Sequence, residues 1–228
     1  MNTGYTQLVM FDIDGTLIDS EEYDAMLFKQ AIREVLDIEI GDNWSSYRNV
    51  TDSGILEEIM ETCGIVYDRG LIHDKVKQLF FDLNERYLTE RPHALREIPG
   101  ARYFINRLKA MESVAVAIAT GGWEETARMK LEGVGIGTAD LTLVSSSDAL
   151  SRTEIIRLAE NRALAGREVS IKTYFGDGIW DKHACEVLGY DFIAIGNNVD
   201  HCTRFADFQA TESIISHLGL PSSALRPG

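Results

Sequence analysis

Five short apolar runs, each of strand length, constrain most strongly what this chain can fold into. Each run is nearly continuous rather than alternating, and together they occupy residues 8–11, 114–119, 141–144, 173–175 and 192–195. Continuous runs of this length are typical of strands buried on both faces of a parallel sheet. Helical apolar spacing separates the later runs, at residues 101–111, 123–131, 153–164 and 182–188. The alternation predicts a doubly wound α/β core with a parallel, Rossmann-like sheet.

The interval from residue 20 to about residue 92 departs from this alternation. Its apolar residues have helical spacing at 22–36, 53–62 and 68–88, with no convincing strand between them. Pro92 ends the last of these segments, because proline disfavours a helical conformation in the residue before it. We therefore expect a core domain of residues 1–18 and 93–228, interrupted by a helical domain of residues 19–92.

Charge and cysteine content exclude several classes of partner and site. The formal net charge of −14 argues against a nucleic acid or an anionic membrane surface, since both are bound by clustered Lys and Arg. The three cysteines form no C-x-x-C pair, and the longest apolar run is too short to cross a bilayer. The first residues lack a signal-peptide pattern, so we expect a cytoplasmic protein, as a monomer or homodimer.

Two aspartates and a glycine follow the first predicted strand, as Asp12, Asp14 and Gly15. In an extended segment residues i and i+2 point to the same side, so two carboxylates, or a carboxylate and a carbonyl, meet at one spot. A hard divalent cation relieves this repulsion, and Mg²⁺ is the usual ion where phosphate completes its shell. Gly15 allows a sharp turn and a close approach of backbone N–H groups to an anion.

Polar residues also follow two later predicted strands. Asp177 and Asp181 follow the fourth, and Asp177 would reach the same ion if that strand lies beside the first. Thr120 ends the second strand, and Gly121 and Gly122 precede a helix, an arrangement suited to a phosphate. Each motif alone is also explained by turn chemistry. Their shared position at the carboxyl ends of strands favours a common site.

The segments DIDGTL, ATGG and GDGIWD, in this order and with a helical insertion after the first, resemble the haloacid dehalogenase (HAD) superfamily. The similarity is to the branch with a helical C1-type cap, which includes phosphatases and β-phosphoglucomutases. It implies that residues 19–92 form the cap over an HAD core.

The resemblance also implies a role for each matching residue. Asp12 would be the nucleophile that forms an aspartyl-phosphate, and Asp14 the general acid and base. Mg²⁺ would be held by Asp12, the backbone carbonyl of Asp14, Asp177 and Asp181, and the phosphoryl group by Thr120, Gly121 and Gly122. The acid at Asp14 favours phosphate-ester chemistry, because a halide leaving group needs no proton.

One departure from the family pattern concerns a lysine that normally neutralises nucleophile and phosphate. The expected window, SSSDALSRTEII, contains Arg152 but no lysine. A guanidinium binds phosphate well, so Arg152 is the candidate replacement, although it could also be a solvated residue at a helix start. Lys172 lies at the start of the fourth predicted strand, so we expect it at the end of the sheet away from the site.

In the resembling branch, the loop between cap helices reaches the site, and here Arg48 and Asn49 are the candidate substrate-binding residues. Arg48 could equally be solvated. Thr51 and Asp52 are better explained as helix N-caps.

We expect a Mg²⁺-dependent phosphatase acting on a small phosphorylated metabolite. Two alternatives stay open: a phosphomutase of the β-phosphoglucomutase type, and a catalytically weak phosphate- or partner-binding protein, which the absent lysine suggests.

Overall fold

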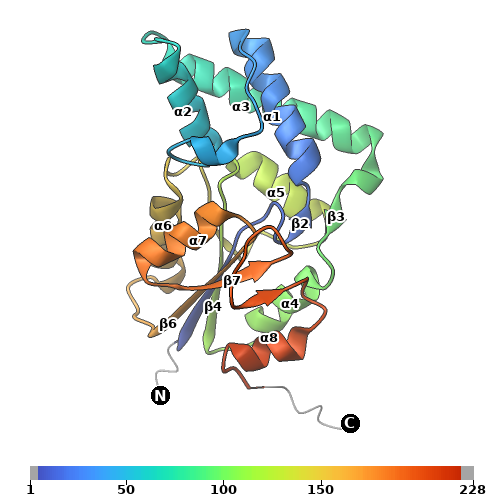
Figure 1. The fold of residues 1–228 in the computed structure, drawn as a ribbon. Helices are drawn as coiled ribbons and strands as arrows, with labels where there is room; N and C mark the ends of the chain where they lie inside the picture. Colours follow the sequence, from blue (N-terminus) through green and yellow to red (C-terminus); the bar gives the residue numbers. More distant parts are fainter. Residues whose placement is uncertain (1–4, 222–228) are drawn as a thin grey trace.

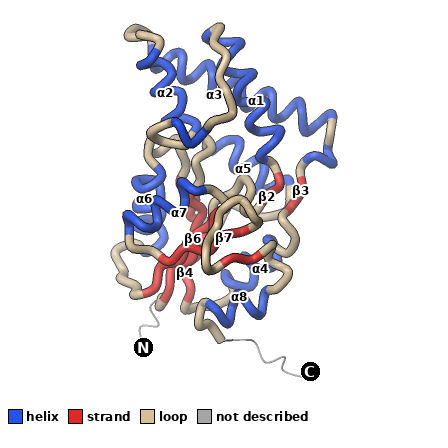
Figure 2. Tube along the Cα trace, in the orientation of Figure 1, coloured by secondary structure: helices blue, strands red, loops and turns tan. Residues whose placement is uncertain are grey.

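The computed structural model of this chain describes residues 5–221. Its main sheet has six parallel strands in the order β5-β4-β1-β6-β7-β8 (Figures 1 and 2). These strands are β5 (Thr142–Val144), β4 (Val114–Ala119), β1 (Gln7–Phe11), β6 (Ile171–Gly176), β7 (Asp191–Ile195) and β8 (Arg204–Phe205). The parallel order with β1 inside the sheet confirms the predicted doubly wound α/β core.

Helices cover both faces of this sheet. One face packs against α4 (Ala101–Lys109), α5 (Glu124–Gly133) and α8 (Thr211–His217), and the other against α6 (Arg152–Leu164) and α7 (Ile179–Leu188). Alternate side chains of β1 point to the two faces, so Val9 joins the first layer and Leu8 the second. Every residue of β1 is buried, which explains its continuous apolar run.

The register of the sheet brings three strand ends together. Phe11 of β1 lies opposite Ile118 of β4 and Phe175 of β6, both in parallel pairs. The residues that follow these strands therefore emerge at one edge of the sheet, where open α/β folds bind ligands.

Three helices lie together beyond this edge, in the upper part of Figure 1. They are α1 (Glu21–Leu36), α2 (Asp52–Thr62) and α3 (Arg69–Glu90), with a short 3₁₀ helix, η1 (Trp44–Ser46), between the first two. Their apolar faces share one hydrophobic cluster. The predicted helical insertion after the first strand is thus confirmed.

The chain passes between sheet and helical insertion through two adjacent segments. Strand β2 (Ile18–Asp19) pairs antiparallel with β3 (Arg96–Glu97), just after the 3₁₀ helix η2 (Pro92–Ala94). Neither strand was predicted, nor were β8 and α8, because elements of two to seven residues are too short to show a clear apolar period. Within residues 5–221, no helix combines the length and apolar character needed to cross a membrane.

Candidate active site

Three buried carboxyl groups converge at the edge of the sheet. Asp12 follows β1, Asp177 follows β6, and Asp181 lies in the first turn of α7. One carboxylate oxygen from each lies within 4.8 Å of the other two. The adjacency of β1 and β6, which the sequence required for this meeting, is present in the structure.

The electrostatics of this cluster suit a divalent cation. Burial raises the pKa of each of the three carboxyl groups, and repulsion from neighbouring carboxyl groups adds to the rise. Removal of three carboxylates from water is costly unless a cation or hydrogen-bond donors compensate them. An all-oxygen donor set of this kind matches what Mg²⁺ binds, so the residues present fit the ion.

Gly15 permits the loop after β1 to pass directly over this cluster. Its φ is +75°, and a Cβ at this position would lie 2.3 Å from Oδ2 of Asp177. A side chain would therefore collide with the Asp177 carboxylate and strain the backbone, so only glycine fits here.

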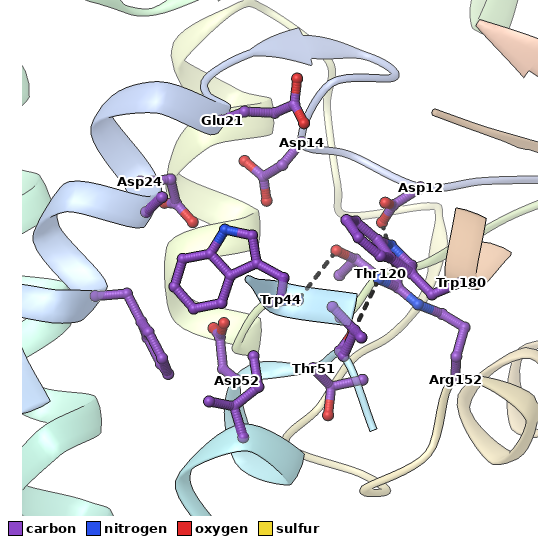
Figure 3. Close-up of a pocket in the computed structure, with 16 residues that line it drawn as sticks. Asp12, Asp14, Glu21, Asp24, Trp44, Thr51, Asp52, Thr120, Arg152 and Trp180 are labelled. Carbon is purple, nitrogen blue, oxygen red and sulfur yellow. Dashed lines mark hydrogen bonds and ion pairs between the residues drawn. The ribbon is translucent and has the colours of Figure 1, made fainter. Parts of the chain in front are cut away.

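Arg152 is buried beside the nucleophile candidate. Its Nη1 donates to Oδ1 of Asp12 at 3.2 Å (Figure 3). Its Nε forms an ion pair with Oδ1 of Asp181 at 3.3 Å, and its Nη2 donates to the carbonyl of Val50 at 3.3 Å. Burial alone would lower the pKa of this guanidinium, but Asp181 and Asp12 raise it above its ordinary value. The guanidinium of Arg152 thus supplies a positive charge beside Asp12, the role for which Arg152 was the predicted replacement of a lysine. Lys172 forms an ion pair with Glu160 instead.

Thr120, Gly121 and Gly122 directly follow β4, which flanks β1 on the side away from β6. The amide of Gly122 donates to Oγ1 of Thr120 at 3.3 Å. A Cβ on Gly121 would lie 2.6 Å from Nη2 of Arg152, so the absent side chain makes room for the guanidinium. The predicted residues from β1, β4 and α6 are therefore brought together.

Lys130 is a site residue that the sequence reasoning missed. It projects from α5, is 1% exposed, and its Nζ lies 2.5 Å from Oδ1 of Asp14 and 2.6 Å from Oδ1 of Asp24. Burial by itself lowers the pKa of Lys130, but the two carboxylates raise it above its ordinary value. The Ser20 hydroxyl also donates to Oδ1 of Asp14, so this oxygen is held by two donors.

Residues at the start of α2 join the helical insertion to the core. Thr51 caps α2 by accepting from the amide of Gly54, as predicted, and also donates to the carbonyl of Leu150. The amide of Asp52 donates to the carbonyl of Gly121 at 2.8 Å. The prediction that Asp52 also caps the helix is wrong: Asp52 is the first residue of α2, and its carboxylate accepts instead from the amide of Trp123 at 2.9 Å, because the helical insertion packs against the core here.

Trp123 extends this junction from the core side. Its indole is completely buried in the hydrophobic cluster of the helical insertion, and Nε1 donates to Oγ of Ser53 at 2.8 Å. Ser53 in turn donates to the carbonyl of Ser146. The insertion is therefore packed against the core over the site.

A cavity of about 130 Å³ lies next to these contacts and is lined by residues of both parts of the chain. Figure 3 shows the carboxyl groups of Asp14, Asp24 and Asp52 directed into it. Its lining also contains Asp12, Thr120, Gly121, Gly122, Arg152, Phe28, Trp44 and Trp180. The arrangement combines a nucleophile candidate, an acid–base candidate and a basic group around one small space.

Arg48 and Asn49 do not line this cavity. They border a neighbouring hollow beside α7, and Arg48 has a side chain that is 66% exposed. The guanidinium forms ion pairs with Glu58 and Glu61 of α2. In this arrangement the insertion residues that line the cavity include Asp24, Phe28, Trp44 and Asp52 instead.

Comparison with protein families gives one match. The profile of haloacid dehalogenase-like hydrolases matches residues 9–195, which include all the converging residues described above. Among curated proteins, no significant match is found.

Similar folds occur among solved structures. A hydrolase from Pseudomonas syringae has a TM-score of 0.69 at 18% identity, covering 92% of this chain and 97% of its own. A β-phosphoglucomutase from Clostridium difficile has a TM-score of 0.68 at 14% identity, with 94% and 97% covered. A predicted phosphoglycolate phosphatase from Haemophilus somnus has a TM-score of 0.61 at 17% identity, with 94% and 99% covered. At these identities the similarity establishes the fold.

Proposed function

Because the chain belongs to the haloacid dehalogenase-like hydrolase family, we propose that it is a Mg²⁺-dependent phosphatase that hydrolyses a small phosphorylated metabolite. The reaction would pass through an aspartyl-phosphate on Asp12. The observation that carries this proposal is the convergence of Asp12, Asp177 and Asp181 on one point, with Arg152 beside Asp12.

Asp12 is proposed as the nucleophile because it belongs to the carboxylate cluster, accepts from Arg152 and lines the same cavity as the glycine loop after β4. Its carboxylate would attack phosphorus, forming an O–P bond while the bond to the leaving alcohol breaks. Arg152 would hold phosphoryl oxygens together with the hydroxyl of Thr120 and the amide of Gly121, since a guanidinium matches a phosphate with paired N–H donors.

Asp12, the carbonyl of Asp14, Asp177 and Asp181 would hold the ion. When bound, Mg²⁺ supplies positive charge that offsets the approach of a phosphoryl group to a carboxylate. The buried carboxyl groups support this assignment, because the described residues supply only Arg152 as a cation in ion-pair contact with any of them.

Asp14 is proposed as the general acid, then the base that activates water for hydrolysis of the aspartyl-phosphate. Its Oδ1 is held by Lys130 and Ser20. Its Oδ2 and Oγ1 of Thr120 lie 3.7 Å and 3.8 Å from where a Cβ on Gly122 would be, and all three residues line the cavity. This carboxylate oxygen would exchange the proton with the alcohol.

Residues 19–92 are proposed to act as the cap over a core of residues 1–18 and 93–228. The contacts of Thr51, Asp52 and Ser53 with the core would exclude water during formation of the phospho-enzyme. Trp123 would anchor the closed position, because its indole is buried in the cap cluster.

The proposal is tested with p-nitrophenyl phosphate and the purified chain. We expect turnover that needs Mg²⁺, stops with excess EDTA, and is lost in Asp12→Asn, since an amide cannot act as this nucleophile. Glu85→Gln, an exposed carboxylate on α3, is the matched control and keeps full activity. Wild-type turnover no greater than that of Asp12→Asn would instead indicate a binding protein without efficient chemistry.

A further inference from the structure

Resting on the proposed function, we infer that the leaving group carries an ammonium group, so that the substrates are phosphate monoesters of small amino alcohols. The inference comes from the part of the cavity that the phosphate does not need. This part is lined by the cap, which contributes acidic and aromatic side chains but no basic one among the described lining residues.

The cap wall of the cavity is acidic and aromatic. Asp24 and Asp52 direct their carboxyl groups into it (Figure 3), and Phe28 and Trp44 contribute aromatic rings to its lining. Carboxylates beside aromatic rings are the combination that stabilises an ammonium group, through ion pairing and the negative faces of the rings.

The basic groups at the cavity are already engaged. Among the described residues that line it, Arg152 is the only basic one, and it contacts Asp12, Asp181 and the carbonyl of Val50. Lys130, behind the lining, is held by Asp14 and Asp24. Among the described residues that line the cavity, no further positive side chain is left to receive a second anion on the substrate.

The carboxylate of Asp52 has no cationic partner among the described residues. Its carboxylate accepts one hydrogen bond, from the amide of Trp123, and forms no ion pair among the residues that the structure describes. Burial and the nearby Asp24 raise the pKa of Asp52 well above its ordinary value. An ammonium group in the cavity would compensate this carboxylate.

The cavity has room for a small leaving group. It measures about 130 Å³, close to the roughly 150 Å³ that holds a molecule the size of benzene, so a short amino alcohol attached to phosphate can be accommodated. A sugar bisphosphate would bring a second anion to a lining that has no second basic side chain among the described residues, which weighs against phosphomutase chemistry.

Three phosphate esters with the same two-carbon skeleton test this inference. O-phosphoethanolamine ends in an ammonium group, 2-hydroxyethyl phosphate in a hydroxyl and phosphoglycolate in a carboxylate. We expect kcat/KM to fall in that order, with at least about a tenfold difference between the first and the last, because like charges at a buried interface repel strongly. Any other order overturns the inference.

A substitution shows whether the cap carboxylate causes the preference. Asp52→Asn keeps an acceptor for the Trp123 amide but removes the charge, so the ratio of kcat/KM for O-phosphoethanolamine to that for phosphoglycolate should fall several-fold. Glu85→Gln removes an exposed cap charge of the same kind and should leave the ratio unchanged. An unchanged ratio in Asp52→Asn contradicts the assignment.

Parallel assays with p-nitrophenyl phosphate separate the two levels of the proposal. Turnover that depends on Asp12, combined with the wrong order of the three esters, overturns the substrate class and leaves the phosphatase proposal standing. Absence of turnover on every ester overturns the phosphatase proposal itself. If Asp52→Asn fails to fold, the order measured with the unsubstituted chain still decides the inference.

Discussion

The Nζ atom of Lys130 lies 2.5 Å from Oδ1 of Asp14, and the two side chains come from different elements, α5 and the loop after β1. The same nitrogen contacts Asp24 on cap helix α1. One buried cation therefore joins the proposed acid–base group to the cap. Its removal leaves two carboxylates facing each other without compensation.

Substitution of Lys130 by Met should lower the free energy of unfolding by about 3–5 kcal/mol, since loss of one partner leaves uncompensated buried charge. Urea denaturation at neutral pH measures the change. Lys109→Met is the matched control, because Lys109 pairs with an exposed Asp140 and such pairs contribute about 1 kcal/mol or less. Equal losses in the two variants would contradict the structural importance of Lys130.

Asp14→Asn should affect substrates according to their leaving groups. Loss of a general acid costs about 10²–10⁴-fold in rate where the leaving alkoxide needs a proton. We expect a loss of that size for alkyl phosphates and a clearly smaller loss for p-nitrophenyl phosphate, whose leaving group is stable as an anion. Equal losses on the two classes would argue against the acid role of Asp14.

The parallel core was predictable because a strand buried on both faces has a distinctive composition. Leu8 and Val9 face opposite helical layers, and both positions must be apolar. The meeting of Asp12 and Asp177 was also predictable, on the condition that the strands before them lie side by side. The structure meets this condition, because β1 pairs with β6.

The cap side of the site could not be predicted in the same way. Asp52 has a residue type typical of a helix N-cap but lies one residue inside α2, and its contact with Trp123 depends on how cap and core pack. Lys130 did leave a signal: it lies within a helical stretch next to Leu131, which is fully buried, and three residues after buried Ala127. A lysine on the core-facing side of a helix requires a buried acidic partner.

Arg48 illustrates the opposite case. A basic residue in the loop between cap helices matched the expectation for a substrate contact, but local carboxylates on α2 bind it in the structure. The sequence does not indicate that these glutamates compete with a substrate for Arg48. Glu58 and Glu61 become neighbours of Arg48 only when the loop folds back on the helix.

Stability without metal should depend on pH through the buried carboxyl groups. Burial raises the pKa of Asp181 to about 7 and that of Asp24 to about 6, both from an ordinary value of 3.8. Between pH 4 and these values the folded state binds more protons than the unfolded state, so the free energy of unfolding falls as pH rises. The loss is complete above the folded pKa values.

Urea denaturation in EDTA at pH 5 and pH 8 measures this effect. We expect lower stability at pH 8, with Mg²⁺ restoring part of the difference because it binds the ionised carboxylates of the folded state. Asp181→Asn should flatten the dependence, as it removes one of the titrating groups. Stability that rises between these pH values in EDTA would contradict the burial-driven shift.

Gly121→Ala tests the position of Arg152 without changing any charge. The added Cβ would lie 2.6 Å from Nη2 of Arg152, so the guanidinium must move away from Asp12. Because a displacement of about 1 Å in a catalytic group can cost about 100-fold in rate, kcat/KM for p-nitrophenyl phosphate should fall by about 10- to 100-fold. Gly137→Ala is the control, since no atom lies within 4 Å of its Cβ. Its activity should equal that of the unsubstituted chain, and circular dichroism should show that both variants fold. Full activity in Gly121→Ala would mean that Arg152 need not occupy its observed position during catalysis.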